Sequence, residues 1–293
     1  MADLSALQNL KLAKAIGADP DDEISSSLDR PLMKFSLDGD PVPGHEVEAG
    51  ILGRWLVALQ NAISSVAYSL DDARLRYDSG PIPREIHEAT KLLAGASFPS
   101  SYGMVLEASR ESQQTALPGT SLDYLLDSAV NRIFDVADKA ENGEDEAVLD
   151  AAVPLGRRAI GHLSELSGVL ASAGANITLS WQPHSDELRV SRLTTSSAAR
   201  CRAVLKSAEV EDSHQQITGN FIGSTQTRGF IEIETTDGVV VVHAPRDEVV
   251  GHSANLWHRR VVVDVRVTTA RYPSGGERRT YRLVKITEES NRS

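Results

Sequence analysis

The sequence contains a single cysteine, Cys201, among 293 residues. One thiol excludes an intrachain disulfide and is typical of a protein that folds in a reducing compartment. No run of about 18 consecutive apolar residues occurs, which excludes a helix that spans a membrane. The chain does not open with a basic segment followed by an apolar run, so we expect no secretory signal. From these absences we expect a cytoplasmic protein.

The sequence also lacks the short motifs that carry well-understood chemistry. It holds no nucleophile elbow of the form G-x-S-x-G, no phosphate loop, and no G-x-G-x-x-G segment after a strand. His243, His252 and His258 lie close together in sequence, but their spacing matches no zinc motif. Cys201 falls within an amphipathic helical pattern, where a buried thiol is the usual state. We therefore expect no cofactor and no metal.

Aromatic residues make up only 5% of the chain, so we expect cores built from Leu, Val, Ile and Ala. The net charge of −11 is unevenly distributed. Residues 1–200 carry 17 basic and 29 acidic side chains, whereas residues 201–293 carry 13 and 12. Only the C-terminal part can therefore meet a polyanion without strong repulsion. Arginine outnumbers lysine by 23 to 7, which a GC-rich coding genome explains as readily as selection for arginine chemistry.

Residues 1–30 have the composition of a flexible N-terminal segment. An amphipathic pattern over 4–16 predicts a short helix, and the acidic, serine-rich stretch that follows is typical of a linker. A docking peptide for a partner is the alternative interpretation of this segment.

Residues 31–213 mix helical and strand patterns, which predicts one helix-rich α+β domain with a small mixed sheet; two domains are the alternative. The longest helical pattern runs over 45–71, where Trp55, Leu59 and Ile63 belong to one apolar stripe. Further helices are expected at 84–94, 122–136, 154–173 and 196–208. Strands are expected at 32–37, 101–107, 176–181 and 188–193, with the first two paired. The acidic stretch 141–146 is expected to be a loop, and 209–213 a connecting segment.

Residues 214–288 carry the clearest fold signal, and 289–293 are expected to be a tail. Strand patterns occur at 217–222, 229–235, 239–243, 257–269 and 279–286, with a break compatible with a helix at 245–256. Asp237-Gly238 predicts a tight hairpin, and Val261, Val263, Val265 and Val267 share one face of the fourth strand. This order of elements resembles the OB fold, a partly open barrel of five strands. The resemblance covers this quarter of the chain and implies a small β-barrel; other small barrels are alternatives.

The hairpin between the last two strands is the best candidate for binding a polyanion. Arginines neutralise phosphates, tyrosines stack on bases, and OB-like barrels often use this loop. The candidate nucleic-acid-binding residues are Arg271, Tyr272, Arg278, Arg279, Tyr281 and Arg282, with Arg259 and Arg260 as further candidates. Glu232 and Glu234 face outward on the second strand, which disfavours nucleic-acid binding on the barrel face itself.

Three functional hypotheses follow. The leading one is a non-enzymatic intracellular binding or assembly protein, an accessory subunit in a bacterium, whose partner is another protein or a second copy of the chain. The first alternative is a nucleic-acid-binding protein that uses the arginine-rich hairpin. The second is an enzyme whose site is assembled from distant segments.

Overall fold

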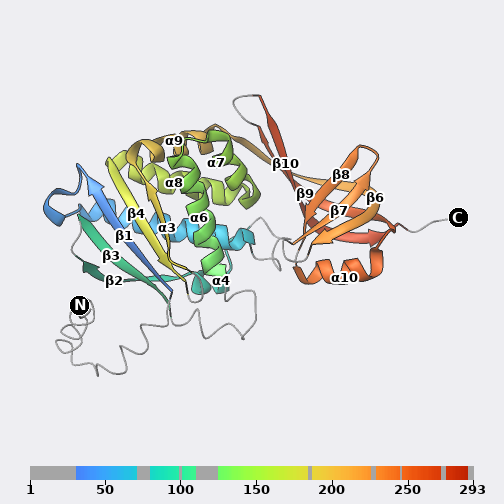
Figure 1. Ribbon diagram of the computed structural model, residues 1–293, viewed down its shortest axis with the longest axis horizontal. Helices are drawn as coiled ribbons and strands as arrows, with labels where there is room; N and C mark the ends of the chain where they lie inside the picture. Colours follow the sequence, from blue (N-terminus) through green and yellow to red (C-terminus); the bar gives the residue numbers. More distant parts are fainter. Residues whose placement is uncertain are drawn as a thin grey trace, which may run out of the picture.

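The computed structural model describes residues 31–70, 80–98, 101–109, 125–183, 187–225, 229–244, 246–271 and 275–289. The predictions for residues 1–30 and for the end of the C-terminal tail lie outside the described residues. Two β-sheets organise the described chain, and each has its own buried apolar cluster (Figure 1). Helices pack on the first sheet, and we call this sheet together with its helices the body. The second sheet closes into a barrel. The predicted α+β class is confirmed. None of the described helices is long and apolar enough to cross a membrane.

The body sheet has five strands in the order β2-β3-β1-β4-β5. Their bounds are Leu32–Gly39 for β1, Leu92–Phe98 for β2, Tyr102–Ala108 for β3, Ala175–Gln182 for β4 and Arg189–Leu193 for β5. β1 pairs with β3 as predicted, with Phe35 opposite Met104. All four pairings between neighbours are antiparallel, which corrects the expectation of a mixed sheet. Alternation in the sequence indicates which face is buried, but it carries no information on strand direction.

The sequence did not predict β2. The helical pattern expected over 84–94 ends early, because α4 covers only Arg84–Ala89 and the chain then enters β2. β2 is an edge strand that pairs with β3 alone, and most of its residues are exposed. An edge strand of small residues lacks the alternation that marks a half-buried strand, so this pattern gave no strand signal.

Helices cover one face of the body sheet. They are α3 (Ala49–Leu70), α6 (Leu125–Glu141), α7 (Asp145–Ala152), α8 (Gly156–Ala173) and α9 (Thr195–Ser207). Their apolar stripes join Met33, Phe35 and Leu37 of β1 in one core. α7 begins inside the stretch 141–146 that was expected to be a loop, and acidic residues suit the positive end of a helix. Gly174 caps α8 in the left-handed conformation that glycine readily adopts.

The barrel consists of β6 (Glu209–Thr225), β7 (Phe230–Thr235), β8 (Gly238–His243), β9 (Arg260–Arg271) and β10 (Glu277–Glu288). These strands close in the order β10-β8-β7-β6-β9. β8 and β10 run parallel, whereas the other described pairs are antiparallel. The helix α10 (Arg246–Leu256) lies between β8 and β9 in sequence and contributes the buried Val249 to the core. The four predicted inward valines of β9 are all 0% exposed.

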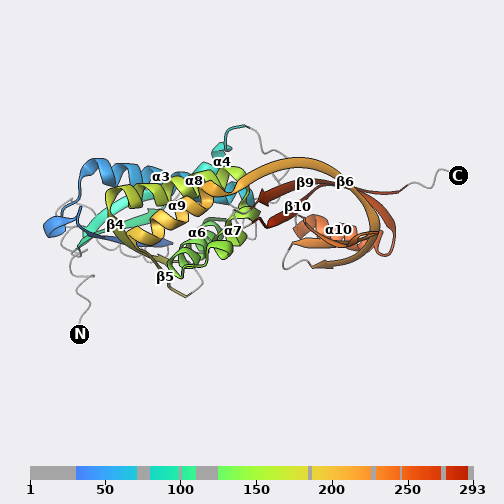
Figure 2. The ribbon, with the colours of Figure 1, turned by 90° about the horizontal axis from the view of Figure 1, so that it is seen from above.

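Three barrel strands extend beyond the barrel and reach the body. β6 begins at Glu209, so the expected connecting segment 209–213 is part of a strand that pairs with β9. Figure 2 shows β6 leaving α9 and arching into the barrel. Val210 and Ala270 pack against the core of the body. We call the extended parts of β6, β9 and β10 the ribbon. One face of the ribbon contacts the body.

Candidate functional site

The structure divides the candidate arginine hairpin between two faces of the ribbon. In the register of β9 and β10, Arg278 lies opposite Ala270, whereas Arg279 lies opposite Thr269. Because successive side chains of a strand point to opposite faces, Arg278 and Arg282 share the face of the buried Ala270. Arg271, Arg279 and Tyr281 belong to the other face. Tyr272 lies outside the described residues. The six candidates therefore do not form one continuous surface.

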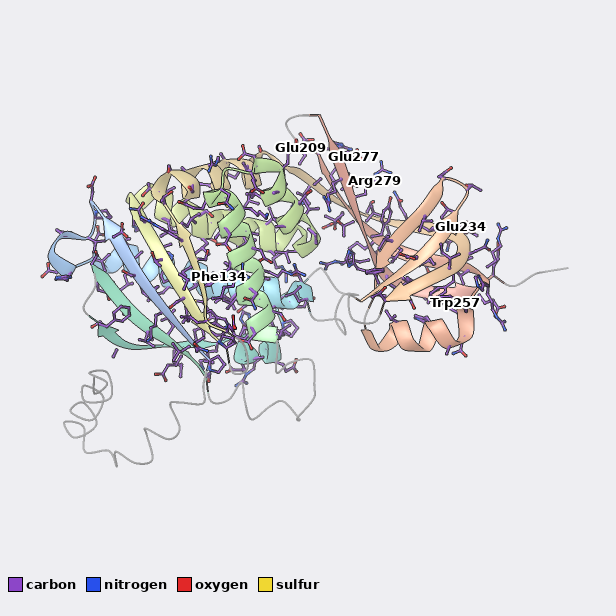
Figure 3. All side chains as sticks on the ribbon, viewed as in Figure 1. Phe134, Glu209, Glu234, Trp257, Glu277 and Arg279 are labelled. Atoms are coloured by element: carbon purple, nitrogen blue, oxygen red, sulfur yellow. The ribbon has the colours of Figure 1, made fainter. Side chains whose placement is uncertain are left out.

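Carboxylates surround Arg271 and Arg279, which lie on the face of the ribbon opposite Ala270. Arg271 forms ion pairs with Glu209, Glu211 and Glu277, at N to O distances of 3.8, 3.4 and 3.7 Å. Arg279 donates from Nε to Glu277 Oε1 over 2.6 Å, and this hydrogen bond raises the pKa of the Arg279 guanidinium. Figure 3 shows Glu277 and Arg279 near the tip of the hairpin. A phosphate that binds here has to compete with these carboxylates.

Arg278 and Arg282, on the face of Ala270, join the barrel to the body. Arg278 forms an ion pair with Asp150 of α7, and Arg282 donates to the carbonyl of Pro154. The neighbouring positions on this same face are small and buried, with Thr268 at 6% and Thr280 at 7% exposed. This junction was not foreseen. The signal for it is the run of small uncharged residues at positions that would carry charges if the ribbon were solvated.

The outer face of β7 and β8 combines exposed apolar and acidic side chains. Val239 and Val241 are 55% and 43% exposed. Glu234 lies opposite Val239, and Glu232 lies opposite Val241. Glu232 also lies across Gly223 of β6, where an added Cβ would clash with its carboxylate. We call the four residues Glu232, Glu234, Val239 and Val241 the valine face.

Sequence reasoning identified the outward glutamates of the valine face but missed its valines. Residues 239–242 form an unbroken run of four valines. Such a run has no alternation, so the sequence does not reveal which of its members are exposed. The structure supplies that assignment, because Val242 is 0% exposed and Val240 packs against the core.

An aromatic side chain is exposed on the same part of the barrel. Trp257 is 49% exposed and contacts Phe221 edge to face, with ring centroids 6.1 Å apart. It lies in the turn after α10, three residues before β9. The strand was expected to begin at residue 257, so its observed start is later. Figure 3 shows Glu234 and Trp257 on the part of the barrel that is remote from the body.

The remaining candidate chemistry is dispersed. Among the described residues, no three His, Cys, Asp or Glu side chains are grouped to hold a metal ion. Cys201 is 1% exposed, and burial raises the pKa of its thiol. The cavity beside it has a volume of about 30 Å³ and a mainly apolar lining, which leaves room for little more than a water molecule.

Comparisons with protein-family models, with curated proteins and with solved structures found no match to this chain. The function therefore has to be argued from the geometry of the chain itself.

Proposed function

We propose that this chain is a binding or assembly protein that holds a protein partner on the valine face of its barrel. The order of the barrel strands, the parallel pair β8 and β10, and the helix between β8 and β9 support an OB-fold assignment. OB folds bind oligonucleotides and oligosaccharides on the face of their second and third strands. In this barrel those strands are β7 and β8.

The observation that carries the proposal is the exposure of Val239 and Val241 beside two glutamates. Apolar side chains in the centre of a patch with charged side chains around them are typical of protein interfaces. The charge selects the partner: a segment with apolar residues and Lys or Arg complements this face, because its cations pair with Glu232 and Glu234. A nucleic acid is disfavoured here, since its phosphates would meet those carboxylates.

Single-stranded nucleic acid on the arginine hairpin is the competing proposal. The ion pairs of Arg271 with three glutamates, and the contacts of Arg278 and Arg282 with the body, weigh against it. The two proposals differ in ligand and in surface, so one set of titrations separates them.

The test measures fluorescence anisotropy with the full chain. The probes are a peptide that alternates Lys and Val, the same peptide with Glu in place of Lys, and a single-stranded oligonucleotide. We expect only the Lys-containing peptide to bind, and the double variant Val239→Ser/Val241→Ser to weaken its binding about tenfold or more. Glu232→Gln/Glu234→Gln should weaken it less, mainly at low salt.

Val57→Ser is the matched control, because Val57 is 61% exposed but lies on α3 of the body. Equal binding of both peptides, or an unchanged affinity in the valine double variant, contradicts the proposal. Binding of the oligonucleotide that is lost in Arg271→Ala/Arg279→Ala and falls steeply with salt supports the competing proposal instead. A pull-down from native cells, with and without nuclease, then identifies the partner.

A further inference from the structure

A groove of about 430 Å³ lies where the body meets the barrel. Its walls come from the end of α3, the first half of α8 and Asp212 of β6. Ligand sites for small molecules typically have volumes of about 300–1,000 Å³. The groove is therefore large enough for a small organic molecule, and it is separate from the valine face.

One end of the groove is positively charged. α8 is 18 residues long, and no side chain caps its N-terminus. The free amides and the helix dipole at such an end favour anions. Arg158 is held here, because it donates to the carbonyl of Gly80 over 2.6 Å and lies over the ring of Tyr68 at 5.3 Å. Arg157 is exposed, and it has no hydrogen bond or ion pair to any residue that the structure describes.

A buried hydroxyl in the wall of the groove gives independent evidence for a ligand. Ser65 of α3 is 2% exposed, and its Oγ has no hydrogen-bond partner within the described chain. A buried hydroxyl without a partner is unfavourable, so nearly all buried polar groups have one. A ligand oxygen in the groove would satisfy this hydroxyl.

The middle of the groove is open over Gly161. A Cβ added at this position of α8 would meet nothing within 4 Å. Glycine within a helix is less favourable than alanine, and no neighbouring described atom requires it here. The space above Gly161 is thus available to a ligand that lies along the helix.

Two carboxylates also line the groove. Glu165 pairs with His162, with 3.4 Å between Oε2 and Nδ1, and Asp212 accepts a hydrogen bond from the hydroxyl of Thr268 over 2.7 Å. These carboxylates repel a second phosphate, but they can accept hydrogen bonds from ligand hydroxyls. The lining therefore suits a ligand that carries one anionic group together with hydroxyl groups.

We propose that this groove binds a small phosphate monoester that carries hydroxyl groups, in the manner of a sugar phosphate. Its phosphate lies at the N-terminus of α8 beside Arg157 and Arg158, within reach of the Ser65 hydroxyl. Its sugar lies over Gly161 with its hydroxyls toward Glu165. This proposal does not depend on the function proposed for the barrel.

Isothermal titration calorimetry of the full chain tests the proposal. The probes are ribose 5-phosphate, inorganic phosphate, ribose and sulfate, all at matched ionic strength. We expect ribose 5-phosphate to bind more tightly than inorganic phosphate, and ribose and sulfate to bind weakly or not at all. Arg157→Gln and Ser65→Ala should each weaken binding by about tenfold, which corresponds to a lost charged or buried hydrogen bond. Arg84→Gln is the control, since Arg84 is an exposed arginine on α4.

Gly161→Leu gives the sharpest result. The substitution fills the groove and favours the helix, so binding should be abolished while the melting temperature of the free protein is kept or raised. Ser65→Ala should likewise keep or raise that temperature, because it removes an unsatisfied hydroxyl. The proposal is overturned if no phosphate probe binds more tightly than about 10 mM, or if Gly161→Leu binds like the wild type. Equal affinity for ribose 5-phosphate and inorganic phosphate overturns the sugar part and supports the phosphate part.

Discussion

The body and the barrel differ in how far they bury polar side chains. In the body, several polar side chains are buried in hydrogen-bonded pairs: Trp181 Nε1 donates to Asp127 Oδ1 over 2.9 Å, and the hydroxyls of Ser64 and Thr90 lie 3.0 Å apart. Among the described residues, the buried polar side chains of the barrel strands are Thr268 and Thr280, and pairs such as Arg259 and Glu288 lie on the barrel surface. The body therefore specifies its packing partly through buried hydrogen bonds, whereas the barrel relies on strand closure and apolar fit.

This difference predicts different responses to substitution. In the barrel, removing core volume should have the largest effect, because the interior has few other sources of stability. In the body, removing one partner of a buried polar pair should also be costly, since the other partner is left unsatisfied. The junction between them consists of an exposed ion pair, a hydrogen bond and a small apolar contact, so single substitutions there should have small effects.

The largest expected effect comes from Phe221→Ala in the barrel core. Phe221 is 0% exposed, and the loss of an aromatic ring from a core lowers the free energy of unfolding by about 3–5 kcal/mol. Hydrogen exchange followed by segment should show faster exchange in β6 to β10, with β1 and β4 protected as before. Val239→Ala is the control and should change stability by less than about 0.5 kcal/mol. Equal loss of protection in both sheets would mean that body and barrel unfold as one unit.

The next effect is that of Asp127→Ala in the body. Asp127 is 9% exposed and accepts the indole N–H of Trp181, which is 0% exposed. The alanine variant leaves this donor unsatisfied, so we expect a loss of about 1–3 kcal/mol in urea denaturation. Asp127→Asn retains an acceptor oxygen and should lose clearly less. If the two variants are equally stable, the buried hydrogen bond does not distinguish the body from the barrel.

The parts of this structure that the sequence predicted are those whose environment leaves a local pattern. The inward valines of β9 alternate with polar residues, and the apolar stripe of α3 recurs every three or four residues, because each element has one buried face. Asp237-Gly238 is a turn signal that acts over a few residues. The inward valines, the helix and a tight turn between β7 and β8 all appear in the structure, with Gly238 as the first residue of β8.

The parts that could not be predicted depend on contacts between distant segments. In β2 and the ribbon, the exposure of each side chain depends on which distant segments pack beside the strand. Alternation of apolar and polar residues therefore does not reveal these strands in the sequence. Strand alternation separates Arg278 from Arg279, but which of the two faces meets the body depends on the docking of Ala270. The groove combines α3, α8 and β6, and no spacing in the sequence connects Ser65 with Arg157 and Asp212.

The junction should show a smaller, salt-dependent coupling. Arg278 and Asp150 form an ion pair between ribbon and body, with side chains 46% and 44% exposed. For such a pair we expect a coupling energy of about 0.2–1 kcal/mol from a double-mutant cycle of Arg278→Ala and Asp150→Ala in urea denaturation. The coupling should decrease between low and high salt. A coupling well above this range, or one that salt does not change, would mean that the junction is more deeply buried than its exposure indicates.

The smallest expected effect is a pH dependence at the same junction. Burial, together with Arg282 of β10 and Arg132 of α6, lowers the pKa of His243 below its usual value. The folded chain then binds this proton less readily than the unfolded chain, so stability falls as the pH drops through the unfolded value of about 6.5. The loss is complete once the pH lies below the folded pKa, and it should be small because the ring stays partly exposed. His243→Gln should reduce the difference in melting temperature between pH 7.5 and pH 5.5. If His243→Gln instead increases that difference, protonated His243 stabilises the folded chain, and the two arginines do not govern its titration.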